Sequence, residues 1–230
     1  MTEKFINQIY DDNYVKLLNT GSVGAVFEQT HKTLERGLPK KEFDVVLEIG
    51  AGQGQHVKFV KHAWKSYLET DIRLDLLKRA TKSRLQQQGL EQAYADAEDL
   101  QNFGDESFDR VIVTCVLAHL KDAEKALLEW RRVLKPNGYL SIYIPSEPGF
   151  LLRVARTLTT VPKARKLGYN HLSFHYREHR NHFPAMKMLL METFSADYKK
   201  WYTYPIPKLS WNFSLWKIVQ IKKAGPHEKN

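Results

Sequence analysis

The sequence predicts an α/β fold built around a doubly wound, mostly parallel sheet, and three observations support this prediction. A short apolar run, Val45–Ile49, is followed at once by a glycine-rich turn. A second strand pattern over residues 67–72 ends in acidic Asp71. An amphipathic helical pattern over residues 126–135 then leads through a turn into a further strand. Strands that alternate with helical segments in this way are typical of parallel sheets covered on both faces.

The first element, Val45–Ile49, is rich in β-branched residues and has the pattern of a strand buried on both faces. Gly50, Gly52 and Gly54 follow it, and glycines let the chain reverse, adopt positive φ and approach a ligand without a Cβ in the way. We expect a helix to open directly after this turn, because its unpaired N–H groups would face the same point. The pattern therefore favours a cofactor site over a purely structural turn.

The spacing of the glycines argues against a dinucleotide. A dinucleotide fingerprint is Gly-x-Gly-x-x-Gly, whereas Gly54 comes one residue early. Glu48 lies at the end of the preceding strand, where its carboxylate would repel a pyrophosphate and help to hold an ammonium group.

The next elements follow the order of a doubly wound fold. Asp71 ends the second strand about where such folds place the carboxylate that binds ribose hydroxyls. We then expect a helix over Arg73–Gln87, followed by an acidic segment at 94–100 and a buried strand at 107–113. A further helix should be stopped by Pro136, and a turn at Asn137–Gly138 should lead into a fifth strand.

This ordered set of motifs, over residues 44–146, resembles the class I S-adenosylmethionine-dependent methyltransferases, specifically the small-molecule (methyltransferase type 11-like) group. The resemblance implies a Rossmann-like, seven-stranded sheet with an antiparallel last strand, and an enzyme whose cofactor is S-adenosylmethionine. Asn137 stands where the family more often has glycine, but asparagine tolerates the left-handed conformation.

The same resemblance implies roles for particular residues. The methionine end of the cofactor would lie against Glu48, Gly50, Gly52 and Gly54; Asp71, with Ile72 beside it, would bind the ribose; and Asp96 with Ala97 would bind adenine. The segment from Cys115 to His119 would lie under the methionine moiety and face the acceptor.

Composition indicates a single domain of 230 residues, because its 43% hydrophobic content suffices for one sizeable core. We divide it into an N-terminal helical cap (1–43), a cofactor-binding core (44–146), a lid-like acceptor-side insertion (147–183) and a C-terminal helix with strands (184–230). One cysteine excludes an internal disulfide framework. The sequence shows no signal peptide and no long apolar run, so we expect a cytoplasmic protein, or one peripheral at the inner face of the membrane.

Charge is distributed unevenly along the chain. Residues 1–150 contain 20 Lys and Arg against 22 Asp and Glu, whereas residues 151–230 contain 15 against 4. A basic acceptor-side segment favours an anionic small-molecule acceptor, such as a phosphorylated or nucleotide-linked sugar; RNA and membrane headgroups also fit, as do plain solubilising lysines. The stretch 150–158, with arginines between apolar residues, is interpreted as a lid helix or as an amphipathic helix on a membrane surface.

Four histidines fall within a dozen residues: His171, His175, His179 and His182. If residues 175–182 are helical, the last three share one face, but ligands from consecutive turns of one helix meet poorly at a tetrahedral metal, so we expect no metal site. We expect instead that His175, Tyr176 and Arg180 bind the acceptor substrate.

An oxygen acceptor must lose a proton, and histidine suits the role of general base. His119, just past the fourth strand, and His179 in the insertion are the catalytic candidates. For His119 the alternative is a packing role. Nitrogen and carbon acceptors are the less favoured alternatives to oxygen.

The two ends of the chain complete the fold. We expect a helix over Phe5–Leu18, a flexible junction at 21–24 and a second helix near 25–36. The aromatic, lysine-rich stretches 198–205 and 211–221 fit the last two strands, although such residues also stack on bases. The chain is interpreted as an enzyme that methylates an oxygen, or less favourably a nitrogen, of a small anionic acceptor such as a sugar or glycan intermediate. An RNA methyltransferase and a non-catalytic cofactor-binding subunit are the alternatives.

Overall fold

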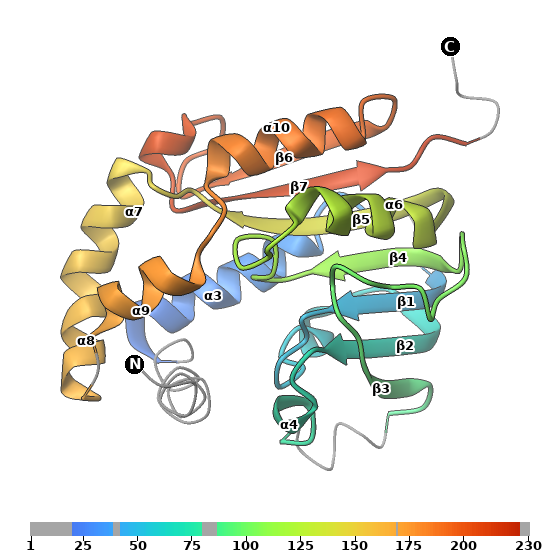
Figure 1. The fold of residues 1–230 in the computed structure, drawn as a ribbon, viewed down its shortest axis with the longest axis horizontal. Coiled ribbons are helices and arrows are strands. Elements are labelled where there is room, and N and C mark those ends of the chain that lie inside the picture. Colours follow the sequence, from blue (N-terminus) through green and yellow to red (C-terminus); the bar gives the residue numbers. More distant parts are fainter. Residues whose placement is uncertain (1–19, 39–41, 80–86, 169, 226–230) are drawn as a thin grey trace.

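The computed structural model describes residues 20–38, 42–79, 87–168 and 170–225, and its centre is one seven-stranded sheet (Figure 1). The strand order is β3-β2-β1-β4-β5-β7-β6. Only the last strand, β7, runs antiparallel to its neighbours, which confirms the predicted fold class. The strands are β1 Glu42–Ile49, β2 Ala63–Asp71, β3 Leu90–Tyr94, β4 Phe108–Val113, β5 Leu134–Pro145, β6 Tyr198–Tyr204 and β7 Trp216–Lys222.

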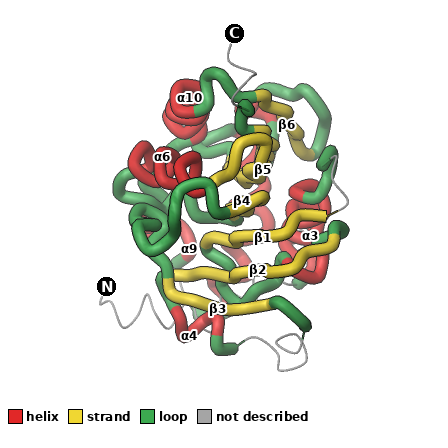
Figure 2. Tube along the Cα trace, turned by 90° about the vertical axis from the view of Figure 1, so that its right-hand side faces the viewer, coloured by secondary structure: helices red, strands yellow, loops and turns green. Residues whose placement is uncertain are grey.

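Helices cover both faces of the sheet (Figure 2). On one face lie α6 (Ala123–Val133) and α10 (Phe183–Thr193), and on the other lies α3 (Gly21–Leu34). The α6 helix turns Ala126, Leu127, Trp130 and Val133 into the main core, as its amphipathic pattern predicts. Asp122 caps this helix by accepting a hydrogen bond from the backbone N–H of Lys125.

The insertion packs at the end of the sheet toward which β1, β2 and β4 point (Figure 1). It contains α7 (Phe150–Ala155), a π-helical turn η3 (Arg156–Thr160), α8 (Val161–Lys166) and α9 (His171–Glu178). Phe150 and Leu158 of this segment are exposed. The remaining short elements are η2 Val57–Phe59, α4 Leu74–Leu77 and η4 Trp211–Phe213. Within the described residues, no helix is long and apolar enough to cross a membrane.

Several expected boundaries differ from the structure. The junction at 21–24 is not flexible but forms the first turn of α3. The glycine turn leads only into the three-residue η2, and not into a longer helix, before β2 begins at Ala63. Of the helix expected over Arg73–Gln87, the described residues contain the four-residue α4, Leu74–Leu77. Residues 80–86 of that expected helix are not described. The helix expected over Phe5–Leu18 also lies outside the described residues.

Pro136 stops α6 earlier than expected. The helix α6 ends at Val133, because the helical conformation is disfavoured for the residue that directly precedes a proline. The segment Pro136–Gly138 then lies inside β5, next to a register shift against β4, instead of in a separate turn. Asn137 adopts a φ of 61°, which confirms the expected left-handed conformation. The final strand begins at Trp216, later than expected, because residues 211–213 form η4.

A buried ion pair joins α3 to the sheet and to the glycine turn. Arg110 of β4 donates from Nη2 to Glu35 Oε1 at 2.6 Å and from Nη1 to Oε2 at 3.1 Å. His56, which follows the glycine turn, lies with Nε2 2.9 Å from Glu35 Oε1. Burial alone would raise the pKa of Glu35, but the charge of Arg110 and the bond to His56 hold this pKa well below its usual value. The pair therefore positions the turn only while Glu35 is ionised.

Replacing Glu35 with Gln is expected to lower the free energy of unfolding by about 3–5 kcal/mol, because Arg110 then stays buried without a counter-charge. Urea denaturation measures this loss. Since folding depresses the pKa of Glu35, its contribution in the native protein is present above the unfolded pKa of roughly 4.3 and is lost as the pH falls below it. Glu28→Gln is the control, because its pair with Lys32 is exposed and contributes little to stability. Equal effects of the two substitutions would contradict the argument.

Candidate functional site

Two adjoining cavities lie at the carboxyl ends of the parallel strands, where ligands bind in open α/β sheets. The larger, about 470 Å³, surrounds the glycine turn and is called here the glycine-turn cavity. The smaller, about 190 Å³, lies under the insertion and is called the histidine cavity. Phe27, Cys115 and His119 line both cavities, so a molecule in one would face a molecule in the other across these three side chains.

The glycine-turn cavity brings together nearly all of the residues predicted to bind a cofactor. Those that line it are Glu48, Gly50, Gly52, Asp71, Ile72, Asp96, Ala97 and Cys115. Gly54 does not line it. Its N–H donates to the carbonyl oxygen of Ala51 at 2.7 Å, so Gly54 shapes the turn instead of contacting the cavity.

Two glycines of the turn serve different physical needs. Gly50 has a φ of 70°, and a Cβ added there would lie 2.1 Å from Cγ2 of Val116, so packing excludes a side chain. Gly52 has a φ of 56°, and an added Cβ would meet no atom within 4 Å. Gly52 therefore borders open space, and its backbone is accessible from the cavity.

The acidic side chains of this cavity also hold its walls in place. Glu48 is buried and accepts a hydrogen bond from the Tyr67 hydroxyl at 2.6 Å. Asp71 accepts from the backbone N–H of Gly52 at Oδ2 and from that of Arg73 at Oδ1, both at 2.8 Å. Burial raises the pKa of Asp71 above its ordinary value. Carboxylates at the ends of β1 and β2 therefore stand on either side of the glycine turn.

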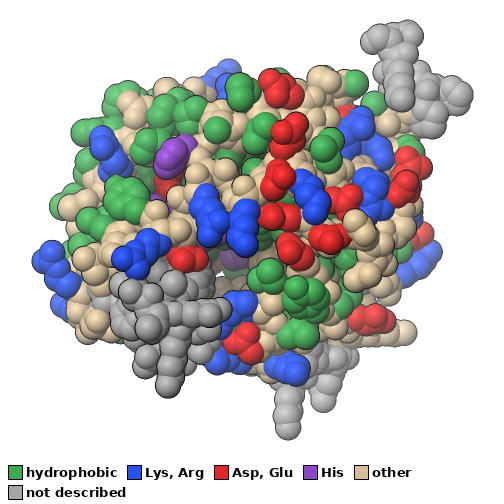
Figure 3. Space-filling model, viewed as in Figure 1, with side chains coloured by type: hydrophobic (Ala, Val, Ile, Leu, Met, Phe, Trp, Pro, Cys, Tyr) green, Lys and Arg blue, Asp and Glu red, His purple; other side chains and the backbone are tan. Residues whose placement is uncertain are grey.

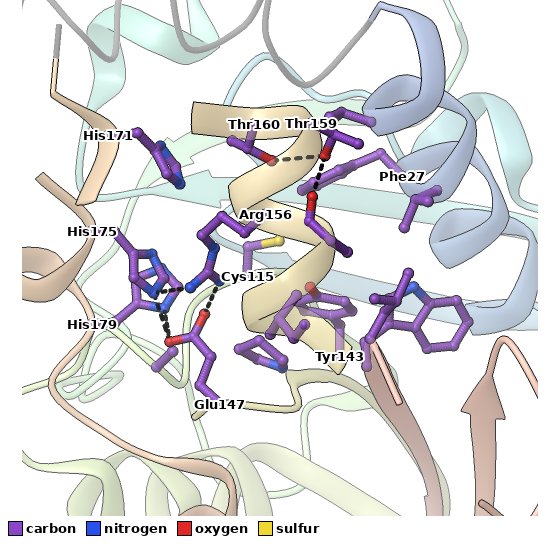
Figure 4. A pocket seen from close by; sticks show the side chains of 18 of the residues that line it. Phe27, Cys115, Tyr143, Glu147, Arg156, Thr159, Thr160, His171, His175 and His179 are labelled. Atoms are coloured by element: carbon purple, nitrogen blue, oxygen red, sulfur yellow. Dashed lines mark hydrogen bonds and ion pairs between the residues drawn. The ribbon is translucent and has the colours of Figure 1, made fainter. Parts of the chain in front are cut away.

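The histidine cavity joins a polar wall to an apolar one (Figure 4). Glu147, two residues beyond the end of β5, points toward His175, His179 and Arg156 of the insertion. The opposite wall is apolar or aromatic and consists of Val23, Val26, Phe27, Tyr143, Leu152, Leu215 and Trp216. A small molecule with an apolar body and one polar end fits such a cavity.

Glu147 is the centre of the polar wall, and the sequence analysis missed it. Its Oε2 lies 2.8 Å from His179 Nδ1 and 2.9 Å from His175 Nε2, and its Oε1 accepts a hydrogen bond from Arg156. Although burial opposes ionisation, the two histidines and Arg156 hold the pKa of Glu147 far below its usual value. The one feature of the sequence that could have indicated Glu147 is its position, because it is the first acidic residue after the fifth strand.

Burial favours the neutral form of three histidines near Glu147. It lowers the pKa of His119 to about 3, that of His171 to about 3 and that of His175 to about 4. Burial likewise raises the pKa of Cys115 to about 12, so this residue is a thiol at neutral pH. Cys115 follows β4 with a φ of 56°, a conformation rare outside glycine that turns the chain under both cavities.

Backbone contacts dock the insertion on the loop after β4. The N–H groups of Arg180 and Asn181 both donate to the carbonyl oxygen of Ala118, at 2.8 and 3.1 Å. The Asn181 side chain also donates to the carbonyl oxygens of Leu117 and Leu120. This docking places the rings of His119 and His179 4.4 Å apart in a T-shaped arrangement. The two predicted catalytic histidines, 60 positions apart in the sequence, therefore lie side by side.

Not every predicted substrate-binding residue reaches the histidine cavity. His175 lines it, whereas Arg180 lines the glycine-turn cavity and Tyr176, 62% exposed, lines neither. Residues 175–182 do not form one helix, since α9 ends at Glu178 and His182 is the N-cap of α10. His182 lines neither cavity.

The basic excess of the C-terminal part does not gather in the histidine cavity. Arg156 is the one Lys or Arg among the described residues that line it, and Glu147 neutralises its charge. On the face seen in Figure 3, basic side chains are scattered among other residues and form no continuous basic patch. The cavity thus presents one Arg156–Glu147 ion pair beside histidines and an apolar wall.

Comparison with known proteins agrees with this geometry. Residues 47–142 match the family model of a methyltransferase domain. The chain is 30% identical over 53% of its length to the hybrid PKS-NRPS synthetase pydA of an Acremonium species, and 41% identical over 42% of its length to the ubiquinone/menaquinone biosynthesis C-methyltransferase UbiE of Bordetella avium. It spans only 3% of the first relative and 39% of the second.

Among solved structures, the N-methyltransferase NodS of Bradyrhizobium japonicum, in complex with S-adenosyl-L-homocysteine, superposes with a TM-score of 0.65. The alignment covers 96% of the chain and 97% of NodS at 16% identity, which shows a shared fold.

Proposed function

The chain belongs to the class I S-adenosylmethionine-dependent methyltransferases, and from this premise we propose that it methylates an oxygen of a small acceptor bound in the histidine cavity. The observation that carries the proposal is the His179–Glu147 pair, set in a cavity that meets the glycine-turn cavity at Cys115 and His119. The two ligands of a methyl transfer would meet at that junction.

The residues of the glycine-turn cavity fit S-adenosylmethionine. The open space at Gly52 admits a ligand close to the backbone, the Glu48 carboxylate suits an ammonium group, and the Asp71 carboxylate suits ribose hydroxyls. When bound, S-adenosylmethionine supplies a methyl group that its sulfonium charge already activates. The chain's own residues then have to orient the acceptor and remove its proton.

His179 is the proposed general base. If its Nδ1–H donates to Glu147, its Nε2 is left as a proton acceptor, and the carboxylate stabilises the imidazolium that forms. His119 packs edge-on against the ring of His179 and helps to hold its orientation. The acceptor hydroxyl would approach His179 while the apolar wall, with Tyr143 and Trp216, excludes water.

The residues that line the histidine cavity narrow the chemical class of the acceptor. Because Arg156 is already paired with Glu147, we propose a hydroxyl compound with an apolar body, in place of the anionic acceptor that the charge distribution along the sequence favours. Methylation of an acidic carbon is the second candidate, since the relative UbiE is a C-methyltransferase and the same base would remove a proton from carbon. The NMR shift of the transferred methyl group distinguishes an oxygen from a carbon product.

Replacing His179 with Ala is expected to lower turnover by about 10²- to 10⁴-fold and to leave S-adenosylmethionine affinity unchanged, because the base acts on the acceptor alone. Transfer of a labelled methyl group to pooled small metabolites measures turnover, and calorimetry measures cofactor binding. His182→Ala is the matched control, since His182 belongs to the same histidine-rich stretch of the sequence but does not line the cavity. Normal turnover of the His179 variant would show that His179 is not the general base.

The same assay tests the alternatives. Label that enters total RNA, with binding that weakens steeply as salt rises, would favour an RNA methyltransferase. Cofactor binding without transfer to any acceptor would favour a non-catalytic subunit. Label in small molecules, insensitive to moderate salt, supports the proposal.

A further inference from the structure

Three side chains of the histidine cavity direct possible ligand atoms toward one point. A carboxylate oxygen of Glu147 and one ring nitrogen each of His175 and His179 all lie within 4.8 Å of one another. His175 and Glu147 are buried, and His179 is largely so. Figure 4 shows that Glu147 approaches from the end of β5 while the two histidines come from α9 and its C-terminal end. Elements far apart in the sequence therefore build this cluster.

We propose that Glu147, His175 and His179 form a binding site for a divalent transition-metal ion such as Zn²⁺ or Co²⁺. Two imidazoles and one carboxylate are a donor set that such ions take, with open positions left for water or a ligand. The inference goes beyond the proposed methyl transfer, which needs no metal ion. It also differs from a site on one helix face, because the carboxylate comes from a separate element.

The distances suit coordination on one side of an ion. Glu147 Oε2 lies 2.9 Å from His175 Nε2 and 2.8 Å from His179 Nδ1. Ligands bound tetrahedrally at 2.0–2.2 Å are separated by about 3.4 Å. Side-chain rotations that lengthen both contacts by about half an ångström would therefore admit the ion.

One contact in the cluster is chemically mismatched, and an ion would resolve it. His175 Nε2 lies 2.7 Å from Nη1 of Arg156, which can only donate, and 2.9 Å from Oε2 of ionised Glu147, which can only accept. A neutral imidazole nitrogen serves one of these neighbours and is mismatched to the other. A metal ion between Nε2 and Oε2 would use the lone pairs of both atoms.

Arg156 competes with the ion. Its guanidinium holds Oε1 of Glu147 and contacts His175, so its positive charge lies beside the proposed metal position. The ion enters only as the guanidinium withdraws from His175. Loss of the Arg156 charge should therefore strengthen metal binding, which is the opposite of what a merely structural cluster would show.

Metal binding and the proposed base role exclude each other. The base needs Nδ1 of His179 to donate a hydrogen bond to Glu147, whereas the ion would take the lone pair of that nitrogen. A proton then resides on Nε2 and the ring cannot accept another. The metal-loaded protein is accordingly expected not to use His179 as its base.

Cobalt titration of the chelator-treated 230-residue chain tests the site. We expect one equivalent of Co²⁺ to bind, with visible absorption bands, and calorimetry to give its affinity. Glu147→Gln, His175→Ala and His179→Ala should each weaken this binding at least about tenfold. Arg156→Gln should tighten it, and His182→Ala should leave it unchanged. S-adenosylmethionine affinity, measured for every variant, verifies that each one is folded.

The inference fails if Co²⁺ gives no stoichiometric spectrum at millimolar concentration, if the histidine variants bind as well as the native protein, or if Arg156→Gln weakens binding. These results are separable from those on function. Methyl transfer by the chelator-treated protein, without metal binding in the titration, overturns only the metal site. Metal binding, with no methyl transfer by the chelator-treated, metal-free protein, overturns only the proposed activity.

Discussion

Replacing Glu147 with Gln is expected to lower methyl transfer by about 10²- to 10⁴-fold while S-adenosylmethionine binds as before. The amide removes the negative charge that stabilises protonated His179, and it leaves Arg156 without its counter-charge. Glu147 lines the histidine cavity and not the glycine-turn cavity, so cofactor affinity has no reason to change.

Turnover with labelled cofactor and calorimetry on the same preparation separate these two effects. Glu129→Gln is the matched control, because Glu129 is also largely buried and paired with an arginine, Arg132, but lines neither cavity. Combining Glu147→Gln with His179→Ala should cost little more than either change alone, since the two side chains act as one unit. Additive losses, or full turnover in the single variant, would contradict the base assignment.

Replacing Asp71 with Ala is expected to weaken S-adenosylmethionine binding by about 10²- to 10⁴-fold. The estimate corresponds to two hydrogen bonds from ribose hydroxyls to a charged group, each worth about 1.5–3 kcal/mol. The substitution also removes the acceptor of the Gly52 N–H, so the glycine turn loses one of its supports.

Asp71→Asn separates the two contributions, because the amide oxygen still accepts one backbone hydrogen bond while the charge is gone. We expect it to bind cofactor with an affinity between those of the native protein and the Ala variant. Asp75→Asn is the control, since Asp75 is half-exposed, pairs with Arg73 and does not line the cavity. Calorimetry measures affinity, and a thermal melt shows that each variant is folded. Unchanged affinity in Asp71→Ala would refute the placement of the cofactor.

Much of the fold and of the glycine-turn cavity could be predicted because the signals are local. Glu48, Gly50, Gly52 and Asp71 stand at strand ends, and parallel strands carry their carboxyl ends to one edge of the sheet. The register of β1 with β2, which pairs Ile49 with Thr70, places these residues together without help from distant segments. The boundaries of helices and strands were less predictable. Pro136 is an example, because pairing between strands makes it part of β5.

The histidine cavity could be predicted only in part. His119 and His179 attracted attention as residues with suitable chemistry, yet nothing local brings them together. Their approach depends on the docking of residues 180–181 on the Ala118 carbonyl. Tyr176 looked equivalent to His175 in the sequence, but one residue along a helix turns a side chain by about 100°, and Tyr176 faces outward.

The sequence by itself determined the sheet, the glycine turn and the acids that flank it, because each depends on spacing within one strand–turn unit. Only the tertiary structure decided what stands beside His179. Glu147, Arg156 and His175 reach it from the end of β5, from η3 and from α9, through burial and ion pairing that no local pattern encodes. A buried carboxylate stays charged only where cations and imidazoles converge on it, and that convergence is a property of the folded chain.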